Sequence, residues 1–169
     1  MEHDERLERL EAARESAREG EYRHALEQAQ DVLDAEPYDL NALALKGNIL
    51  DYQSEVATEL GLADLAAEAS EEARHCYELM LEIDAENVRA LIDSGDHLAR
   101  RGQHKQALGW FDRALKQLDA GRYFSSLDED LAEALTCKRD SLIALGLDSK
   151  AVEVNADGRN RCPDSDSFR

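Results

Sequence analysis

The sequence predicts an all-α protein, and three observations carry this prediction. Helix-favouring residues dominate the chain, with 25 Ala and 24 Leu, whereas the residues that favour pleated sheet are scarce, with 5 Val, 4 Ile and 2 Thr. Apolar residues recur at steps of three and four, which places them on one face of a helix. Glycines fall between these stripes, where a left-handed residue ends one helix and lets the next turn back. The elements should therefore be pairs of helices.

The stripes and glycines recur along the chain at fixed offsets. In the second halves of three segments, a Gly precedes an Ala by five residues: Gly20 and Ala25, Gly102 and Ala107, Gly146 and Ala151. In two first halves, a Leu precedes a Gly by four residues: Leu43 and Gly47, Leu91 and Gly95. This pattern resembles the tetratricopeptide repeat, a helix hairpin of about 34 residues. Small residues at these places let the two helices of a hairpin approach closely.

The resemblance covers nearly the whole chain as four units, at residues 6–39, 40–87, 88–121 and 132–165, with a tail at 166–169. It implies an α-α superhelix of about four stacked hairpins that forms a single domain over residues 1–169. The third unit is the most faithful. The first and fourth are degenerate, as terminal units of a stacked array usually are, and in the fourth Arg139 and Gly158 replace small or helix-favouring residues.

The second unit is longer than the others by about two helical turns in each arm. Gly61 lies seven places beyond the expected turn, and Ala73 lies fourteen beyond its expected place. Seven residues make about two turns, so both apolar stripes keep their side, and the hairpin should project roughly 10 Å past its neighbours. Its tip carries four large apolar residues: Val56, Leu60, Leu62 and Leu65. Either they pair the two arms with each other, or they form a docking or self-association surface.

The ten residues between the third and fourth units carry a second irregularity. Ser126 and Glu129 form a capping box. This box predicts that the first helix of the fourth unit is extended at its N-terminus. Tyr123 and Phe124 just before it either staple the loop onto the core or form an aromatic recognition patch.

The net charge of −18 excludes some partners. So many carboxylates repel a phosphate backbone, so we expect no nucleic acid as a partner. The 15 Arg, only 5 Lys and the acidic surface resemble those of proteins from salt-loving cells, where salt screens self-repulsion. The acidity is equally consistent with a solubility device or with a docking surface for basic partners.

The compartment is predicted to be the cytoplasm. The first twenty residues have no apolar run of a secretory signal, and no stretch of the chain is apolar enough for a membrane span. Three cysteines that are far apart and form no CxxC signal neither a disulfide framework nor a zinc cage. We expect reduced, structural thiols.

Catalytic chemistry has no support in the sequence. Phosphate-binding loops, dinucleotide loops, metalloprotease helices and nucleophile elbows have no matching motif, so we expect no enzyme and no cofactor. Asp93 and His97 lie four apart on one helix and are interpreted as an ordinary helical pair rather than metal ligands. The stretch 155–158 lacks the spacing of a calcium loop.

The family resemblance also implies a concave groove lined by the first helices of successive units, which receives a peptide or protein segment. The groove residues expected here are of mixed polarity: Arg14, Arg18, Asn41, Asn48, Tyr52, Arg89, Asp93, Asp96, Arg100 and Asp140. Arg and Asn side chains can hold carboxylates or a peptide backbone. The alternative is that the four arginines pair with nearby carboxylates. The subclass that clamps chaperone carboxylates is disfavoured, because Leu10, Leu45 and Asp93 stand where it needs basic residues and Asn.

The predicted function is that of a non-catalytic adaptor that binds a protein or peptide partner in this groove. One alternative is a small acidic escort chaperone whose long hairpin serves as a dimer contact. Others are a regulatory subunit of an enzyme complex and a self-assembling structural subunit, in which Leu60, Leu62 and Leu65 are the secondary contact. The sequence leaves open whether the chain is a monomer or a homodimer.

Overall fold

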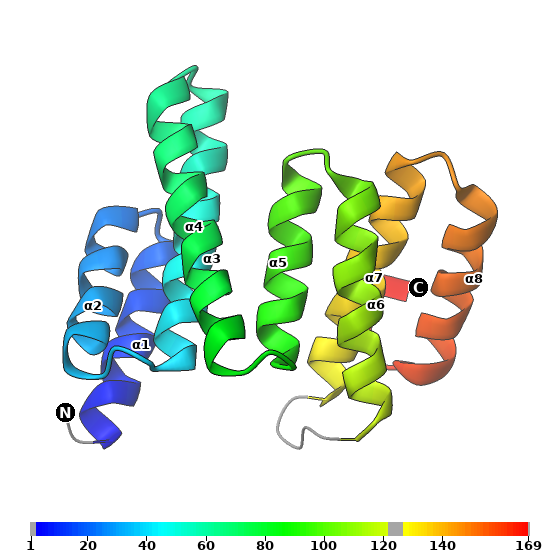
Figure 1. The fold of residues 1–169 in the computed structure, drawn as a ribbon, viewed down its shortest axis with the longest axis horizontal. Coiled ribbons are helices and arrows are strands. Elements are labelled where there is room, and N and C mark those ends of the chain that lie inside the picture. The colour runs from blue at the N-terminus through cyan, green and yellow to red at the C-terminus, as the bar shows by residue number, and fades with distance from the viewer. Residues whose placement is uncertain (1–2, 122–126, 169) are drawn as a thin grey trace. The chain divides into compact units, whose positions relative to one another are not determined.

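The computed structural model describes residues 3–121 and 127–168, and this part of the chain contains eight α-helices, one short 3-10 helix and no strand (Figure 1). The elements are α1 (His3–Arg18), α2 (Tyr22–Ala35), α3 (Leu40–Glu59), α4 (Ala63–Ile83), α5 (Val88–Arg100), α6 (His104–Asp119), α7 (Leu127–Ala144), α8 (Asp148–Arg161) and η1 (Asp166–Phe168). The prediction of an all-α fold is confirmed. The loop interpretations for Tyr123, Phe124 and Ser126 lie outside the described residues.

The chain divides into two compact units, Met1–Ala85 and Glu86–Arg169. The first contains the hairpins α1–α2 and α3–α4, and the second contains α5–α6 and α7–α8 followed by η1. Within the first unit, α3 packs against both α2 and α1; within the second, α7 packs against both α6 and α5. Each unit is thus a stack of two hairpins, as the repeats predict. That all four form one domain stays a prediction.

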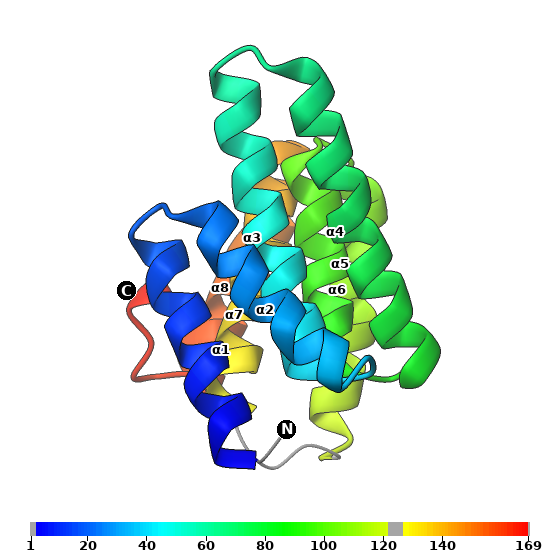
Figure 2. The same ribbon diagram turned by 90° about the vertical axis from the view of Figure 1, so that its left-hand side faces the viewer.

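The second hairpin is elongated, as predicted. Helix α3 has 20 residues and α5 has 13, while α4 has 21 and α2 has 14, so each arm is seven residues longer than a shorter counterpart. Figure 2 shows the α3–α4 turn projecting beyond the α1–α2 hairpin of the same unit. Seven residues at about 1.5 Å each add about 10 Å of helix.

Glycines in the left-handed conformation make the turns inside the hairpins. Gly20, Gly102 and Gly146 have φ angles of 80°, 74° and 69°, which confirms the turns predicted there, and Gly61 ends the long arm with 72°. Such angles cost a residue with a Cβ atom about 1 kcal/mol or more. The first helices α3 and α5 instead begin at side-chain caps, because Asp39 and Asn87 accept hydrogen bonds from Ala42 N and Ala90 N.

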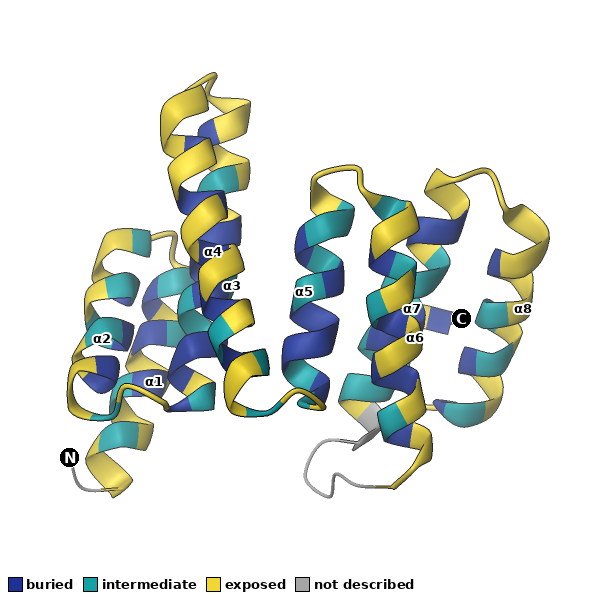
Figure 3. Ribbon diagram, viewed as in Figure 1, coloured by how far each residue is buried: buried dark blue, intermediate teal, exposed yellow. Residues whose placement is uncertain are grey.

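A glycine-to-ring contact joins the two helices of each of the central hairpins. A Cβ atom at Gly47 of α3 would lie 2.5 Å from the ring of Tyr77 in α4, and one at Gly95 of α5 would lie 2.5 Å from the ring of Phe111 in α6. Both rings are fully buried, and Figure 3 shows buried residues along the facing sides of these helices. Only hydrogen leaves room for so close an approach.

The C-terminal segment contains the same kind of glycine-to-ring contact, here between α8 and η1. Gly158 does not end α8 but lies inside it, where a Cβ atom would approach the ring of Phe168 in η1 to 2.4 Å. Phe168 is fully buried. The sequence left open whether the residues after Gly158 are ordered; the buried aromatic ring holds η1 against the last hairpin.

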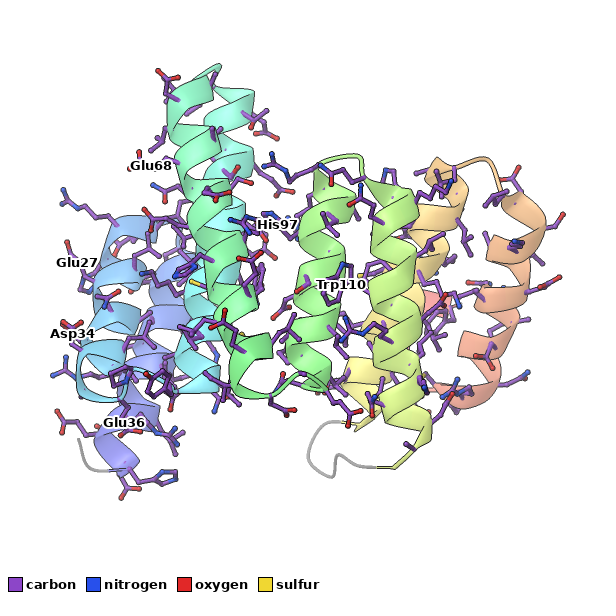
Figure 4. All side chains as sticks on the ribbon, in the orientation of Figure 1. Glu27, Asp34, Glu36, Glu68, His97 and Trp110 are labelled. Atoms are coloured by element: carbon purple, nitrogen blue, oxygen red, sulfur yellow. The ribbon has the colours of Figure 1, made fainter. Side chains whose placement is uncertain are left out.

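Negative charge is unequal between the two units. Met1–Ala85 contains 23 Asp and Glu against 7 Lys and Arg, a net charge of −16, whereas Glu86–Arg169 contains 15 against 13, a net charge of −2. Among the acidic residues of the first unit, Glu27 and Asp34 lie exposed on the outer side of α2 (Figure 4). Nearly all of the excess charge therefore belongs to the first unit.

Replacing Gly47 or Gly95 with Ala should lower the free energy of unfolding by about 1–3 kcal/mol, because the buried ring opposite must move. Gly109, inside α6, is the matched control: a Cβ atom there meets nothing within 4 Å, so Ala should stabilise the helix by up to about 1 kcal/mol. Urea unfolding of the three variants measures both effects. Equal losses at all three positions would contradict the close-approach argument.

We expect added KCl to raise the melting temperature by a few degrees, because salt screens the self-repulsion of the first unit. Thermal melts followed by circular dichroism in low and in molar KCl check this. A melting temperature that stays constant or falls would show that self-repulsion does not limit stability, and would remove the case for adaptation to high salt.

Candidate protein-binding face

Four of the predicted groove residues converge on one pocket of the first unit. Arg14 and Arg18 reach it from α1, and Asn48 and Tyr52 reach it from α3. The pocket measures about 360 Å³, and its lining is completed by Ala17, Tyr22, Leu45 and Ile49. Residues four apart lie one above the other on a helix, so each pair presents two side chains from the same face. Packing of α1 against α3 brings the two pairs together.

The pocket combines an apolar floor with polar groups. Ile49 is buried, and Leu45 and Tyr22 are partly exposed, whereas Tyr52 is exposed. Tyr22, Leu45 and Ile49 were not among the residues predicted to line the groove. The sequence did contain a signal for two of them, because Leu45 and Ile49 follow Asn41 at intervals of four residues and so share its helix face. An apolar residue at such a spacing is, however, equally typical of the hydrophobic core. Asn41 itself is exposed at the start of α3 and does not line the pocket.

The two arginines of the pocket are held by weak ion pairs. Arg14 lies 3.1 Å from Glu11, and Arg18 lies 2.9 Å from Glu15, each pair within α1 and on the solvent side. Exposed pairs of this kind contribute about 0.5 kcal/mol or less. A ligand carboxylate can displace such a partner at little cost, so both guanidinium groups are available for binding.

Asn48 lies beside the same tyrosine that packs on Gly47. The Tyr77 hydroxyl lies 2.9 Å from Asn48 Oδ1 and 2.9 Å from Asp51 Oδ2. It has one proton and donates it to one of these two acceptors. The Asn48 amide thus lies within hydrogen-bond distance of a buried tyrosine at the edge of the pocket.

The predicted groove residues of the second unit form a different arrangement. Arg89 of α5 makes a two-pronged contact with Glu133 of α7, at 2.7 Å and 2.6 Å, and also donates to Asp93 Oδ1 at 2.9 Å and 2.6 Å. Asp130 of α7 lies 3.6 Å from the same guanidinium. One cation thus joins three carboxylates across two helices, and it ties α5 to α7 rather than facing a ligand.

Asp93 is buried, contrary to its expected place on an open face. It is 3% exposed, and within the described part of the chain its Oδ2 atom has no hydrogen-bond partner. Burial raises the pKa of Asp93 to about 6; Arg89 acts in the opposite direction, while Glu133 and Asp96 add to the rise. Its role is that of a structural partner of Arg89.

The remaining predicted groove residues of the second unit also pair locally. Arg100 lies 2.7 Å from Asp96 one turn away, and Asp140 lies 2.8 Å from its neighbour Arg139. All four arginines of the predicted groove therefore contact carboxylates, as the alternative interpretation held. The pairs differ in strength, because those of Arg14 and Arg18 are exposed whereas Arg89 serves a buried carboxylate.

The thiols are poor nucleophiles in this structure. All three cysteines are free, and Cys76 and Cys162 are buried. Burial raises the pKa of Cys76 to about 11 and that of Cys137 to about 12, so both remain protonated at neutral pH. In residues 3–121 and 127–168 no group of three His, Cys, Asp or Glu side chains is placed to hold a metal ion.

A search of the described helices for a membrane span finds none with both the length and the apolar content that a bilayer requires.

Replacing Asp93 with Asn should change how stability depends on pH. Since folding raises the pKa from 3.8 to about 6, the folded chain binds this proton more tightly, so the contribution of Asp93 to the free energy of unfolding rises as pH falls through that window. We expect the wild type to lose up to about 3 kcal/mol relative to the Asn variant between pH 4 and pH 7.5. Urea unfolding at several pH values measures this difference. The exposed Asp164→Asn variant is the control, and a pH-independent difference for Asp93→Asn would contradict the assignment.

Solved structures share this fold over nearly the whole chain. The thermophilic tetratricopeptide-repeat protein TTC0263 of Thermus thermophilus aligns with a TM-score of 0.50 and 14% identity, over 94% of this chain and 92% of that one. The MamA protein aligns with a TM-score of 0.45 and 13% identity, over 95% of this chain and 93% of that one. The sequence matches no protein-family model and no curated protein. From the helix hairpins, the turn glycines and this structural similarity, the chain has a tetratricopeptide-like fold.

Proposed function

We propose that this chain is a non-catalytic protein-interaction scaffold that binds an extended segment of a partner protein on the face formed by α1, α2 and α3. The observation that carries the proposal is the pocket at which Arg14, Arg18, Asn48 and Tyr52 converge. The tetratricopeptide-like fold supports it, because such hairpin stacks present faces of this kind, although the fold alone specifies no partner.

The chemistry of the pocket indicates which segment it would accept. Two guanidinium groups suit a carboxylate, and an amide can bind the peptide backbone of an extended chain. Leu45, Ile49 and Tyr22 suit an apolar side chain. We therefore infer a ligand segment that carries an acidic group next to an apolar residue.

The second unit contributes less to this binding. Arg89 already satisfies Glu133 and the buried Asp93, so a ligand carboxylate would have to replace strong contacts. Breaking a pair of this kind leaves a buried charge without its partner and costs about 3 kcal/mol or more. Binding variants should therefore leave Arg89 in place and target the first unit.

Replacing Arg14 and Arg18 together with Ala should weaken binding of the partner about tenfold or more for each arginine, because each loses a charge-assisted hydrogen bond. Capture of partners from native extract, followed by calorimetric titration of the captured segment, measures the loss. Arg23→Ala is the matched control, since Arg23 is an exposed α2 arginine that does not line the pocket.

Circular dichroism must show equal helix content in all variants. A partner that binds the double variant as tightly as the wild type, or that is lost equally with Arg23→Ala, would refute binding at this pocket.

A further inference from the structure

The tip of the α3–α4 hairpin carries large apolar side chains that the hairpin itself does not bury. Leu60, Leu62 and Leu65 are 68%, 49% and 41% exposed, and Val56 is exposed as well. The arms meet through small side chains instead: Ala57, Ala66 and Ala69 are buried between them. Most of the Leu60 side chain is therefore left uncovered by the two arms, and Figure 3 shows the tip as mainly exposed.

The same tip is acidic. Residues 55–68 contain Glu55, Glu59, Asp64 and Glu68 but no Lys, Arg or His. Within the described part of the chain, no cation lies at ion-pair distance from Glu59, Asp64 or Glu68. The tip, defined here as residues 55–68, thus combines exposed apolar side chains with three carboxylates, those of Glu59, Asp64 and Glu68, that have no ion-pair partner in the described part of the chain.

The last hairpin of the second unit offers an apolar pocket with two arginines and one aspartate in its lining, and one of these arginines, Arg139, also pairs with Asp140. Its α7–α8 face encloses a pocket of about 560 Å³ lined by Arg139, Ile143, Asp148, Ala151, Val152, Asn155, Ala156 and Arg159. Val152 and Ile143 are 68% and 53% exposed. The tip and this face thus each expose large apolar side chains.

The α7–α8 face is open because α7–α8 is the terminal hairpin of its unit. In a stack, each hairpin buries its apolar sides against neighbours, and the last one needs a cap. Here η1 covers only part of it: Phe168 packs on Gly158, and Arg139 and Arg159 donate to the carbonyl oxygens of Ser167 at 2.6 Å and of Phe168 at 2.7 Å. These contacts hold two guanidinium groups at the edge of the apolar pocket.

We propose that the tip of one copy of this chain docks into the α7–α8 face of a second copy. Apolar side chains then meet an apolar pocket, and the carboxylates of the tip meet the Arg139 and Arg159 edge. A symmetric tip-to-tip contact is opposed by like charge, since each tip brings four carboxylates and no cation. Tip and face are different surfaces, so the contact is head-to-tail and produces chains or closed rings. It uses residues outside the peptide-binding pocket.

Sedimentation velocity over a concentration series tests this directly. The wild type should exceed its monomer mass of 18.9 kDa as concentration rises. Leu60→Ser with Leu62→Ser, and separately Ile143→Ser with Val152→Ser, should each remain monomeric. Tyr38→Ser, which removes an equally exposed side chain elsewhere, should associate like the wild type.

Mixing the two double variants distinguishes this contact from others. Each retains one intact surface, so an equimolar mixture should form a dimer of twice the monomer mass and nothing larger. A wild type that is monomeric throughout would overturn the proposal. So would a face variant that still associates, since the tip would then bind another tip, and so would a mixture that stays monomeric.

The electrostatic part has its own control. Glu59→Lys with Asp64→Lys should weaken association at least tenfold, whereas Glu27→Lys with Asp34→Lys makes the same charge change on α2 and should not weaken it (Figure 4). Equal effects of the two pairs would mean that net charge alone controls association, which would contradict the proposed contact.

Discussion

The close approach of a glycine to a buried aromatic ring is the constraint on which the rest of the structure depends. At Gly47 with Tyr77, and again at Gly95 with Phe111, the missing side chain lets one helix of a hairpin rest against the ring of the other. Tyr77 then extends this packing toward the surface, because its hydroxyl group lies 2.9 Å from Asn48 Oδ1 at the pocket. A core contact thereby reaches a residue that lines the pocket. At the end of the chain, Gly158 and Phe168 use the same geometry to hold a short cap instead of a second helix.

Burial separates the exposed arginines of the pocket from the charged residues that support the fold. Arg14, Arg18 and Arg89 all have carboxylate partners, and their residue types give no reason to rank them. The exposed pairs of α1 are worth little and can be exchanged for a ligand. Arg89 instead compensates Asp93, which lies inside the protein, and removing it would leave a charge where water cannot reach. The first unit therefore keeps two exposed arginines at its pocket, whereas the second uses Arg89 to join α5 to α7.

Lengthening both arms of one hairpin by seven residues creates a surface without disturbing the stack. Two added turns return each helix to nearly the same orientation, so the lower part of α3 packs against α1 and α2 while the upper part projects. Side chains on the projecting part have no neighbouring hairpin to cover them. Alanines join the arms there, which leaves the leucines outside.

The sequence by itself determined the helices, their turns and the extra length of one hairpin, because these depend on local rules: apolar spacing, left-handed glycines and the insertion of two whole turns. It also placed Arg14, Arg18, Asn48 and Tyr52 on the faces that meet at the pocket. Only the tertiary structure decided which residues water reaches. Asp93 lies on the same helix face as Arg89, yet it is buried between helices and serves as a partner of Arg89 in the fold. Leu60 is as apolar as the core residues, yet its side chain is exposed to solvent. Periodicity records the direction of a side chain from its own helix, whereas burial depends on the neighbouring helices that lie in that direction.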